Sequence, residues 1–183
     1  MWNSLLAISW FWFIGAVVLS QIPALGKDLL HGDTSVVTML LAVFSIGVAI
    51  GSLLCERLSN HQVEIGLVPV GSIGLSLFTA DLALSTWSFS STITATGSAE
   101  ALTWLQYLAL PGSVRVLLDI ALVGIFGGLF IVPLYAFVQL RTVAERQSQV
   151  ISANNILNAL FMVSAAGMSG VPVSYTHLTL PTN

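Results

Sequence analysis

The fold is decided by residues 114–140, which read VRVLLDIALVGIFGGLFIVPLYAFVQL. From Ile120 to Leu140 this stretch carries no charged side chain. About 20 apolar residues in a helix are enough to cross the hydrocarbon core of a bilayer. Because lipid offers no partner to backbone N–H and C=O groups, a spanning segment of this kind must be a helix. The stretch is therefore expected to be a transmembrane helix.

Glycines and a proline give this helix special surfaces. Gly124, Gly127 and Gly128 lie at positions i, i+3 and i+4, which places them on one helix face. Small residues on one face allow a neighbouring helix to approach closely. Pro133 removes a backbone donor and favours a kink. Gly127, Gly128 and Pro133 are therefore candidates for conformational or gating positions, and plain close packing is the alternative explanation.

Four further stretches have the same character. The chain is 56% hydrophobic and only 7% charged, whereas soluble domains carry about 25% charged residues. No soluble surface can be built from such a composition, so the partner of this chain is the lipid bilayer. The other apolar stretches cover residues 5–25, 34–54, 63–84 and 148–171. The first is too long for the core of a signal peptide, which has about 7–15 residues.

The connections between these stretches predict the topology. Most are short, so consecutive helices should run antiparallel. Only residues 85–113 make a longer excursion, rich in Ser and Thr in its first half. The second half, EALTWLQYLALPG (100–112), predicts a short interfacial helix, because Trp104 and Tyr107 suit the headgroup level.

The few cations predict the orientation. Arg57, Arg141 and Arg146 fall on the side shared with the N-terminus, and Lys27 and Arg115 fall on the other. Cytoplasmic loops carry more Lys and Arg, so the N-terminus is expected in the cytoplasm and the fifth helix is expected to end outside. A sixth helix would then complete a six-helix half, the repeating unit of many secondary transporters.

Composition also excludes several classes of function. The net charge is −3 and no Lys/Arg run is present, so nucleic-acid binding is excluded. Cys55 is the single cysteine, which rules out an internal disulfide and leaves no second thiol for a metal-ligand pair. No cofactor, metal or catalytic residue is expected.

The end of the second apolar stretch carries a motif. Residues 46–61 read IGVAIGSLLCERLSNH, in which Gly47 and Gly51 form a G-x-x-x-G face. Ser52, Glu56 and Arg57 follow where the helix should leave the membrane. The pattern resembles a degenerate cytoplasmic-loop signature of the major facilitator superfamily.

In that signature Ser52 stands for the first glycine, Glu56 for the acid, Arg57 for the base and Ser59 for the second glycine. Residues 60–61 replace the expected cations. The resemblance implies that Glu56 and Arg57 help to hold one conformation of a carrier closed. A charged helix end that marks the membrane boundary explains them equally well.

Two later segments sharpen the resemblance. LVGIFGGLFIVPLYAFVQLR (122–141) and QVISANNILNALFMV (149–163) are similar to the lysophospholipid transporter branch of the superfamily. The form fused to an acyl-glycerophosphoethanolamine acyltransferase also has segments like ISWFWF and GSLLCERL…VEIGLVP. The resemblance covers residues 8–166. It implies an all-α membrane protein, with five transmembrane helices of a six-helix major facilitator half-bundle corresponding to helices seven to eleven of twelve.

The last residues, VSYTHLTLPTN (173–183), differ from the rest. Residues 173–182 resemble a widely used sequencing-library adapter translated in one frame, and a genuine Ser/Thr-rich loop is the alternative. Residues 173–183 are therefore expected to be foreign to the fold, residues 1–172 to be part of a major facilitator domain, and the natural chain to continue past Pro172. No acyltransferase signature is present, so the chain is not expected to be an enzyme.

Amide side chains supply the candidate substrate contacts. Asn154, Asn155 and Asn158 lie within about one helical turn, and amides are costly when they face lipid. They are expected to face other helices or a wet cavity, with Asn154 and Asn158 on one face beside the glycine stripe. Gln21, just before Pro23, is a further candidate for contact with a headgroup. Hydrogen bonds between helices explain the asparagines as well as substrate contact does.

Charged residues inside the spans are few. Arg115 and Asp119, at i and i+4, are expected to pair near the outer end of the fourth helix, in a conformational role. Asp81, toward the outer end of the third helix, is expected at the membrane interface, and a lone buried acid is the alternative.

Three functions follow. The first is lysophospholipid translocation by alternating access in an inner membrane, together with the missing N-terminal half of the transporter. The second is a carrier of another small solute, and the third is the membrane anchor of a fused acyltransferase. Sparse charge favours the lysolipid.

Overall fold

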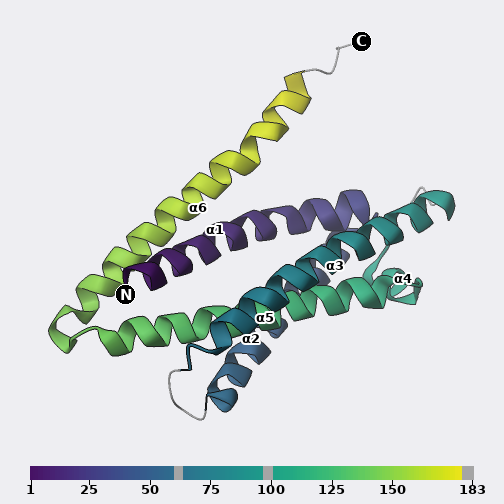
Figure 1. Ribbon diagram of the computed structural model, residues 1–183. Coiled ribbons are helices and arrows are strands. Elements are labelled where there is room, and N and C mark those ends of the chain that lie inside the picture. The colour runs from purple at the N-terminus through teal and green to yellow at the C-terminus, as the bar shows by residue number, and fades with distance from the viewer. Residues whose placement is uncertain (60–63, 97–100, 179–183) are drawn as a thin grey trace. The chain divides into compact units, whose positions relative to one another are not determined.

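The computed structural model describes the backbone of residues 1–59, 64–96 and 101–178, and their side chains except those of 92–96 and 169–178 (Figure 1). The helices in order are α1 (Trp2–Ala24), η1 (Leu25–Leu29), α2 (Thr34–Leu58), α3 (Leu67–Thr96), α4 (Trp104–Ala109), α5 (Ser113–Arg141), η2 (Ala144–Arg146) and α6 (Gln147–Leu178). Among the described residues the single β pairing is one bridge between Gly32 and Leu102. In the described part of the chain, five helices are long and apolar enough to cross a membrane. The predicted all-helical, multi-pass membrane fold is confirmed.

The helices group into two compact units, each with its own packing. Unit 1 comprises Met1–Gln21 and Phe137–Asn183, which hold most of α1 and all of α6. Unit 2 comprises Ile22–Ala136, which hold η1, α2, α3, α4 and most of α5.

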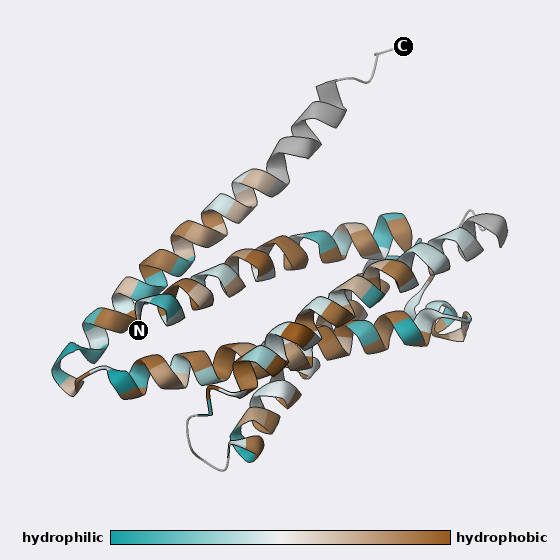
Figure 2. Cartoon of the chain, viewed as in Figure 1, coloured by the Kyte–Doolittle hydropathy of each residue, from teal (hydrophilic) through white to brown (hydrophobic). Residues whose placement is uncertain are grey.

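The long helices are apolar on most sides (Figure 2). On α3, for example, Ile73, Leu77, Leu84 and Trp87 are all exposed, and Trp87 is 80% exposed. A helix that is hydrophobic all round must be buried in protein or in lipid. Since these side chains are not covered by the chain itself, they are suited to contact lipid.

Helix α3 is longer than the sequence predicted. The expectation that residues 85–113 leave the membrane as one excursion is wrong for residues 85–96, which continue the helix. The serines in this segment bond back to their own helix: the Oγ atoms of Ser88 and Ser91 donate to the carbonyl oxygens of Leu84 and Ser88 at 2.9 and 2.8 Å. This local bonding satisfies the hydroxyl groups without breaking the helix.

Helices α2 and α5 pack backbone to backbone through two pairs of glycines. A Cβ atom on Gly128 would lie 2.7 Å from the backbone nitrogen of Ser52, and one on Gly124 would meet the backbone of Phe44. In return, Gly47 and Gly51 of α2 face the backbone of α5. Gly47 meets Ala121 and Gly51 meets Ile125, so residue numbers rise in the same direction along both helices. The two helices therefore run parallel. The G-x-x-x-G face predicted on α2 is thus met by a second G-x-x-x-G face on α5.

The other side of α5 packs against α3. A Cβ atom on Gly71 would lie 2.7 Å from the backbone nitrogen of Phe130, and Gly74 lies against the Phe126 ring. Phe78 stacks on Phe126 with ring centroids 5.3 Å apart. With neighbours on both sides, α5 is the most buried of the five candidate spans.

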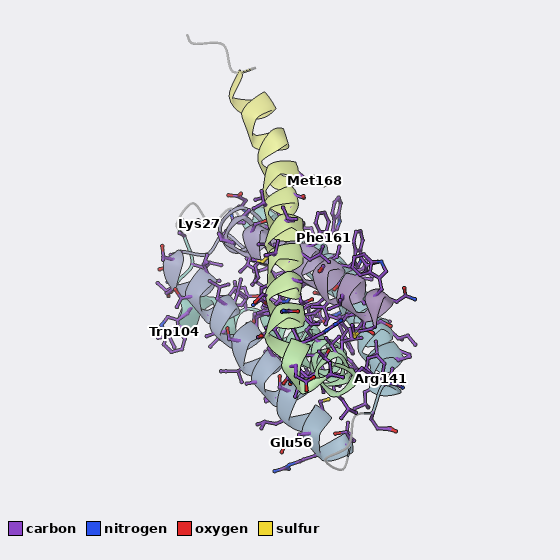
Figure 3. The ribbon with its side chains drawn as sticks, turned by 90° about the vertical axis from the view of Figure 1, so that its left-hand side faces the viewer. Lys27, Glu56, Trp104, Arg141, Phe161 and Met168 are labelled. Atoms are coloured by element: carbon purple, nitrogen blue, oxygen red, sulfur yellow. The ribbon has the colours of Figure 1, made fainter. Side chains whose placement is uncertain are left out.

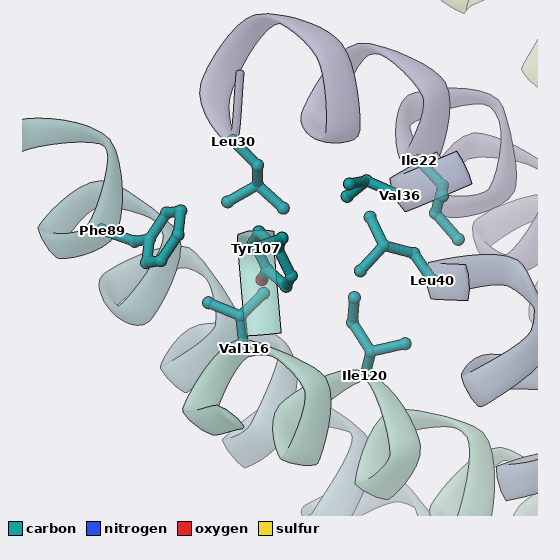
Figure 4. Close-up of a cluster of buried hydrophobic side chains, with 8 residues drawn as sticks. All are labelled: Ile22, Leu30, Val36, Leu40, Phe89, Tyr107, Val116 and Ile120. Atoms are coloured by element: carbon teal, nitrogen blue, oxygen red, sulfur yellow. The ribbon is translucent and has the colours of Figure 1, made fainter. Parts of the chain in front are cut away.

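The apolar core of unit 2 lies where η1, α4 and the adjacent ends of α2, α3 and α5 meet (Figure 4). Tyr107 of α4 is fully buried at its centre and packs on Phe89 of α3, with ring centroids 5.1 Å apart. Val116 and Ile120 contribute the α5 side. Burial raises the pKa of Tyr107, so its hydroxyl stays neutral.

Helix α4 confirms the short helix predicted before Pro111. Gly112 ends the segment with φ +94°, a conformation that residues with a Cβ atom rarely adopt. The backbone of Leu102 exchanges hydrogen bonds with Asp33 and His31, and the backbone nitrogen of Trp104 donates to Ser35 Oγ at 3.0 Å. These bonds hold α4 at the start of α2. Its predicted location at headgroup level stays a prediction.

Asp33 caps α2 at this junction. Its Oδ1 accepts hydrogen bonds from the Ser35 hydroxyl at 2.5 Å and from the backbone nitrogens of Ser35 and Val36 at 2.7 and 3.3 Å. Ser35 therefore links the cap to α4, because its hydroxyl oxygen also accepts from Trp104. The Ser35 hydroxyl, with the two backbone donors, holds the pKa of Asp33 below its usual value of 3.8.

The cap predicts an acid-sensitive contribution to stability. Because the folded pKa is depressed, the stabilisation is present above pH 3.8 and is lost as pH falls through the folded value. Asp33→Ala should unfold more readily at neutral pH in micelles and lose this part of the acid dependence. Asp33→Asn keeps an acceptor oxygen and should lose only the pH dependence. An unchanged acid profile in Asp33→Ala would exclude the cap as its source.

Candidate functional site

The candidate site in unit 1 is a polar contact between α1 and α6. Ser9 Oγ donates a hydrogen bond to Asn158 Oδ1 at 2.8 Å, and both residues are buried. One turn further along each helix, Phe13 and Phe161 meet edge to face with ring centroids 6.4 Å apart; Phe161 is labelled in Figure 3. The polar pair is thus bordered by aromatic rings.

Asn154 lies one turn before Asn158 on the same face of α6. It is 3% exposed, and its Oδ1 has no hydrogen-bond partner among the described residues. The prediction that Asn154 and Asn158 are buried is confirmed. Their predicted place beside the glycines of α5 involves the other unit and stays a prediction.

Asn155 is exposed. Each residue advances about 100° around a helix, which carries Asn155 off the face that holds Asn154 and Asn158, so its predicted contact with another helix or a wet cavity stays a prediction. Gln21 is also exposed, at the end of unit 1. The buried candidates are therefore Asn154 and Asn158, and they are joined by Ser9.

A second polar cluster lies between α3 and α5 in unit 2. The Arg115 guanidinium pairs with Asp81 of α3, with Nη2 2.5 Å from Oδ1. Asp119, 3% exposed, accepts a hydrogen bond from Ser85 Oγ at 2.6 Å. The prediction that Arg115 pairs with Asp119 is therefore wrong. The Asp81 carboxylate lies across the helix interface and pairs with Arg115, whereas its predicted position at the membrane interface stays a prediction.

The remaining candidates belong to α2 and α5 of unit 2. Glu56 and Arg57 are exposed at the end of α2, where Figure 3 labels Glu56. Gly127, Gly128 and Pro133 are buried in α5, and Gly128 belongs to the contact with α2. Their proposed conformational roles stay predictions, and the exposed positions of Glu56 and Arg57 fit both explanations given above.

Sequence reasoning missed Ser9, Ser85 and the Arg115 partner Asp81. A polar residue in an apolar helix indicates that the side chain needs a partner, but it does not indicate which residue of a neighbouring helix that partner is. In the part of the chain that the structure describes, no three His, Cys, Asp or Glu side chains are grouped so that they could hold a metal ion.

No family model, curated protein or solved structure matches this chain.

Proposed function

We propose that this chain is part of a secondary transporter that moves a lysophospholipid across an inner membrane by alternating access. The observation that carries the proposal is the buried Asn154 Oδ1, an acceptor without a donor among the described residues. It lies on a polar helix face next to the Ser9–Asn158 bond, within two candidate membrane spans.

An amphiphilic cargo needs this combination. An unpaired buried acceptor costs about 1–3 kcal/mol, so a ligand that supplies a donor would recover that energy. A lysophospholipid has a free glycerol hydroxyl to donate and one acyl chain for an apolar wall. A diacyl lipid lacks that hydroxyl, which makes the donor a basis for discrimination.

The resemblance of residues 8–166 to lysophospholipid transporters supports the same proposal. On that resemblance α1, α2, α3, α5 and α6 correspond to helices seven to eleven, and the first half of the transporter supplies the facing helices. The N-terminus lies in the cytoplasm in this proposal, because Arg57, Arg141 and Arg146 are expected on its side of the membrane and only Lys27 and Arg115 on the other.

A carrier of a polar solute is the second candidate. It is favoured by the cluster of Asp81, Arg115 and Asp119 inside two candidate spans, because ionisable residues in membrane helices often mark solute or ion paths. Lysolipid uptake into sealed vesicles, compared with uptake of charged solutes, separates the two candidates.

Asn154→Ala tests the proposed function in the whole carrier. Asn154 Oδ1 has no hydrogen-bond partner to lose among the described residues, so the folded yield should hold while lysolipid uptake weakens. We expect apparent affinity to fall about tenfold, which corresponds to one recovered hydrogen bond of about 1.4 kcal/mol.

Two variants on the same helix serve as controls. Asn155→Ala removes an exposed amide and should leave uptake unchanged. Asn158→Ala removes the acceptor of Ser9 and should reduce folded yield instead. Normal uptake affinity in Asn154→Ala would contradict the proposed role of the buried amide.

A further inference from the structure

The cluster between α3 and α5 contains more negative than positive charge. Two carboxyl groups, those of Asp81 and Asp119, share one guanidinium, and that guanidinium is paired with Asp81. Asp119 is the more buried of the two acids, and its hydrogen bond comes from a neutral hydroxyl, that of Ser85.

We propose that Asp119 is a proton-binding site, which Ser85 positions and which Asp81 and Arg115 border. Proton binding at Asp119 requires neither a bound substrate nor a metal ion. A bare carboxylate within a membrane span is costly, and bound protons remove that cost at intramembrane acids. The carboxyl group holds one proton when loaded and releases it to water when unloaded.

The groups around Asp119 do not supply a second cation. On α3 the charged neighbour is Asp81, and on α5 it is Arg115. The titratable residue of α4 is Tyr107, which is neutral, and α2 has no titratable side chain from Thr34 to Leu54. On the adjoining η1, Lys27 and Asp28 are both exposed.

Two further buried hydroxyl groups lie in unit 2. Thr86 follows Ser85 in the chain, and Tyr107 packs at a tilt against Phe89, one turn further along α3. Thr86 Oγ1 and Tyr107 Oη are buried and have no hydrogen-bond partner among the described residues. Figure 4 shows the Tyr107 oxygen toward Val116, on the helix that carries Asp119. Buried groups of this kind are commonly satisfied by ordered water.

Infrared difference spectra of the whole chain in lipid vesicles, between alkaline and neutral buffer, test this site, because exposed carboxyl groups stay ionised in both buffers. We expect a carbonyl band from a protonated carboxyl group, and Asp119→Asn should remove it completely. Asp28→Asn removes an exposed carboxyl group and should leave the band in place. A band that survives in Asp119→Asn, or the lack of any such band in the unaltered chain, would overturn the proposal.

Ser85→Ala keeps the test decisive if Asp119→Asn does not fold. The carboxyl group loses a hydroxyl donor in this variant, so the band should shift in frequency but not vanish. An unshifted band would assign it to another acid and refute the site. We also expect lysolipid uptake to depend less on pH in Asp119→Asn, and this second expectation rests on the proposed function. If the band behaves as expected but no lysolipid is carried, the proposed function fails and the proton site stands.

Discussion

Replacing Gly51 with alanine is expected to push α2 and α5 apart and to reduce the folded yield sharply. The new Cβ atom would lie closer to the carbonyl oxygen of Ile125 than Cβ atoms are found in proteins. That oxygen belongs to a helix backbone, so no side-chain rotation can relieve the overlap. Overpacking of this kind costs about 1–3 kcal/mol and occasionally more. The measurement is the unfolding equilibrium in micelles, together with the yield from membranes.

Glycines elsewhere in the chain provide the control. A Cβ atom on Gly15 of α1 would meet no atom within 4 Å, so Gly15→Ala should fold normally and could gain slightly in helix propensity. Gly128→Ala, on the α5 side of the same contact, should resemble Gly51→Ala, since its Cβ atom would lie 2.7 Å from Ser52 N. Equal stability of Gly15→Ala and Gly51→Ala would show that α2 and α5 do not approach through these glycines.

Replacing Arg115 with aspartate is expected to have the second large effect. The change removes the partner of Asp81 and brings a third carboxyl group to a site that already holds Asp81 and Asp119. Like charges in a span cannot be separated by solvent as they can at a soluble surface. We expect most of the folded protein to be lost, as measured by the monodisperse fraction after extraction in mild detergent.

Exchanging the two charges isolates the pair. Asp81→Arg combined with Arg115→Asp restores one cation across the same interface and should recover much of the folded fraction. Lys27→Asp makes the same change of charge outside the Asp81–Arg115 pair and should have little effect. If the double variant has no larger folded fraction than Arg115→Asp alone, the ion pair between α3 and α5 is not the cause of the lost folded protein.

Much of the fold could be predicted from local pattern. The uncharged stretch from Ile120 to Leu140 required a helix, and α5 runs through it from Ser113 to Arg141. The spacing of Asn154 and Asn158 placed both amides on one face, and both are buried. The failure at residues 85–96 came from reading serines as loop formers, although their hydroxyl groups bond to the preceding turn of the helix.

The sequence by itself determined the helices, their apolar surfaces and the faces of their glycines and amides, because these depend on side-chain chemistry and on a period of 3.6 residues. Only the tertiary structure decided the partners. Arg115 pairs with Asp81, 34 positions away in the chain, and Ser9 bonds to Asn158, 149 positions away. Such choices depend on which helices pack and in which direction, and the helical period contains no information about either.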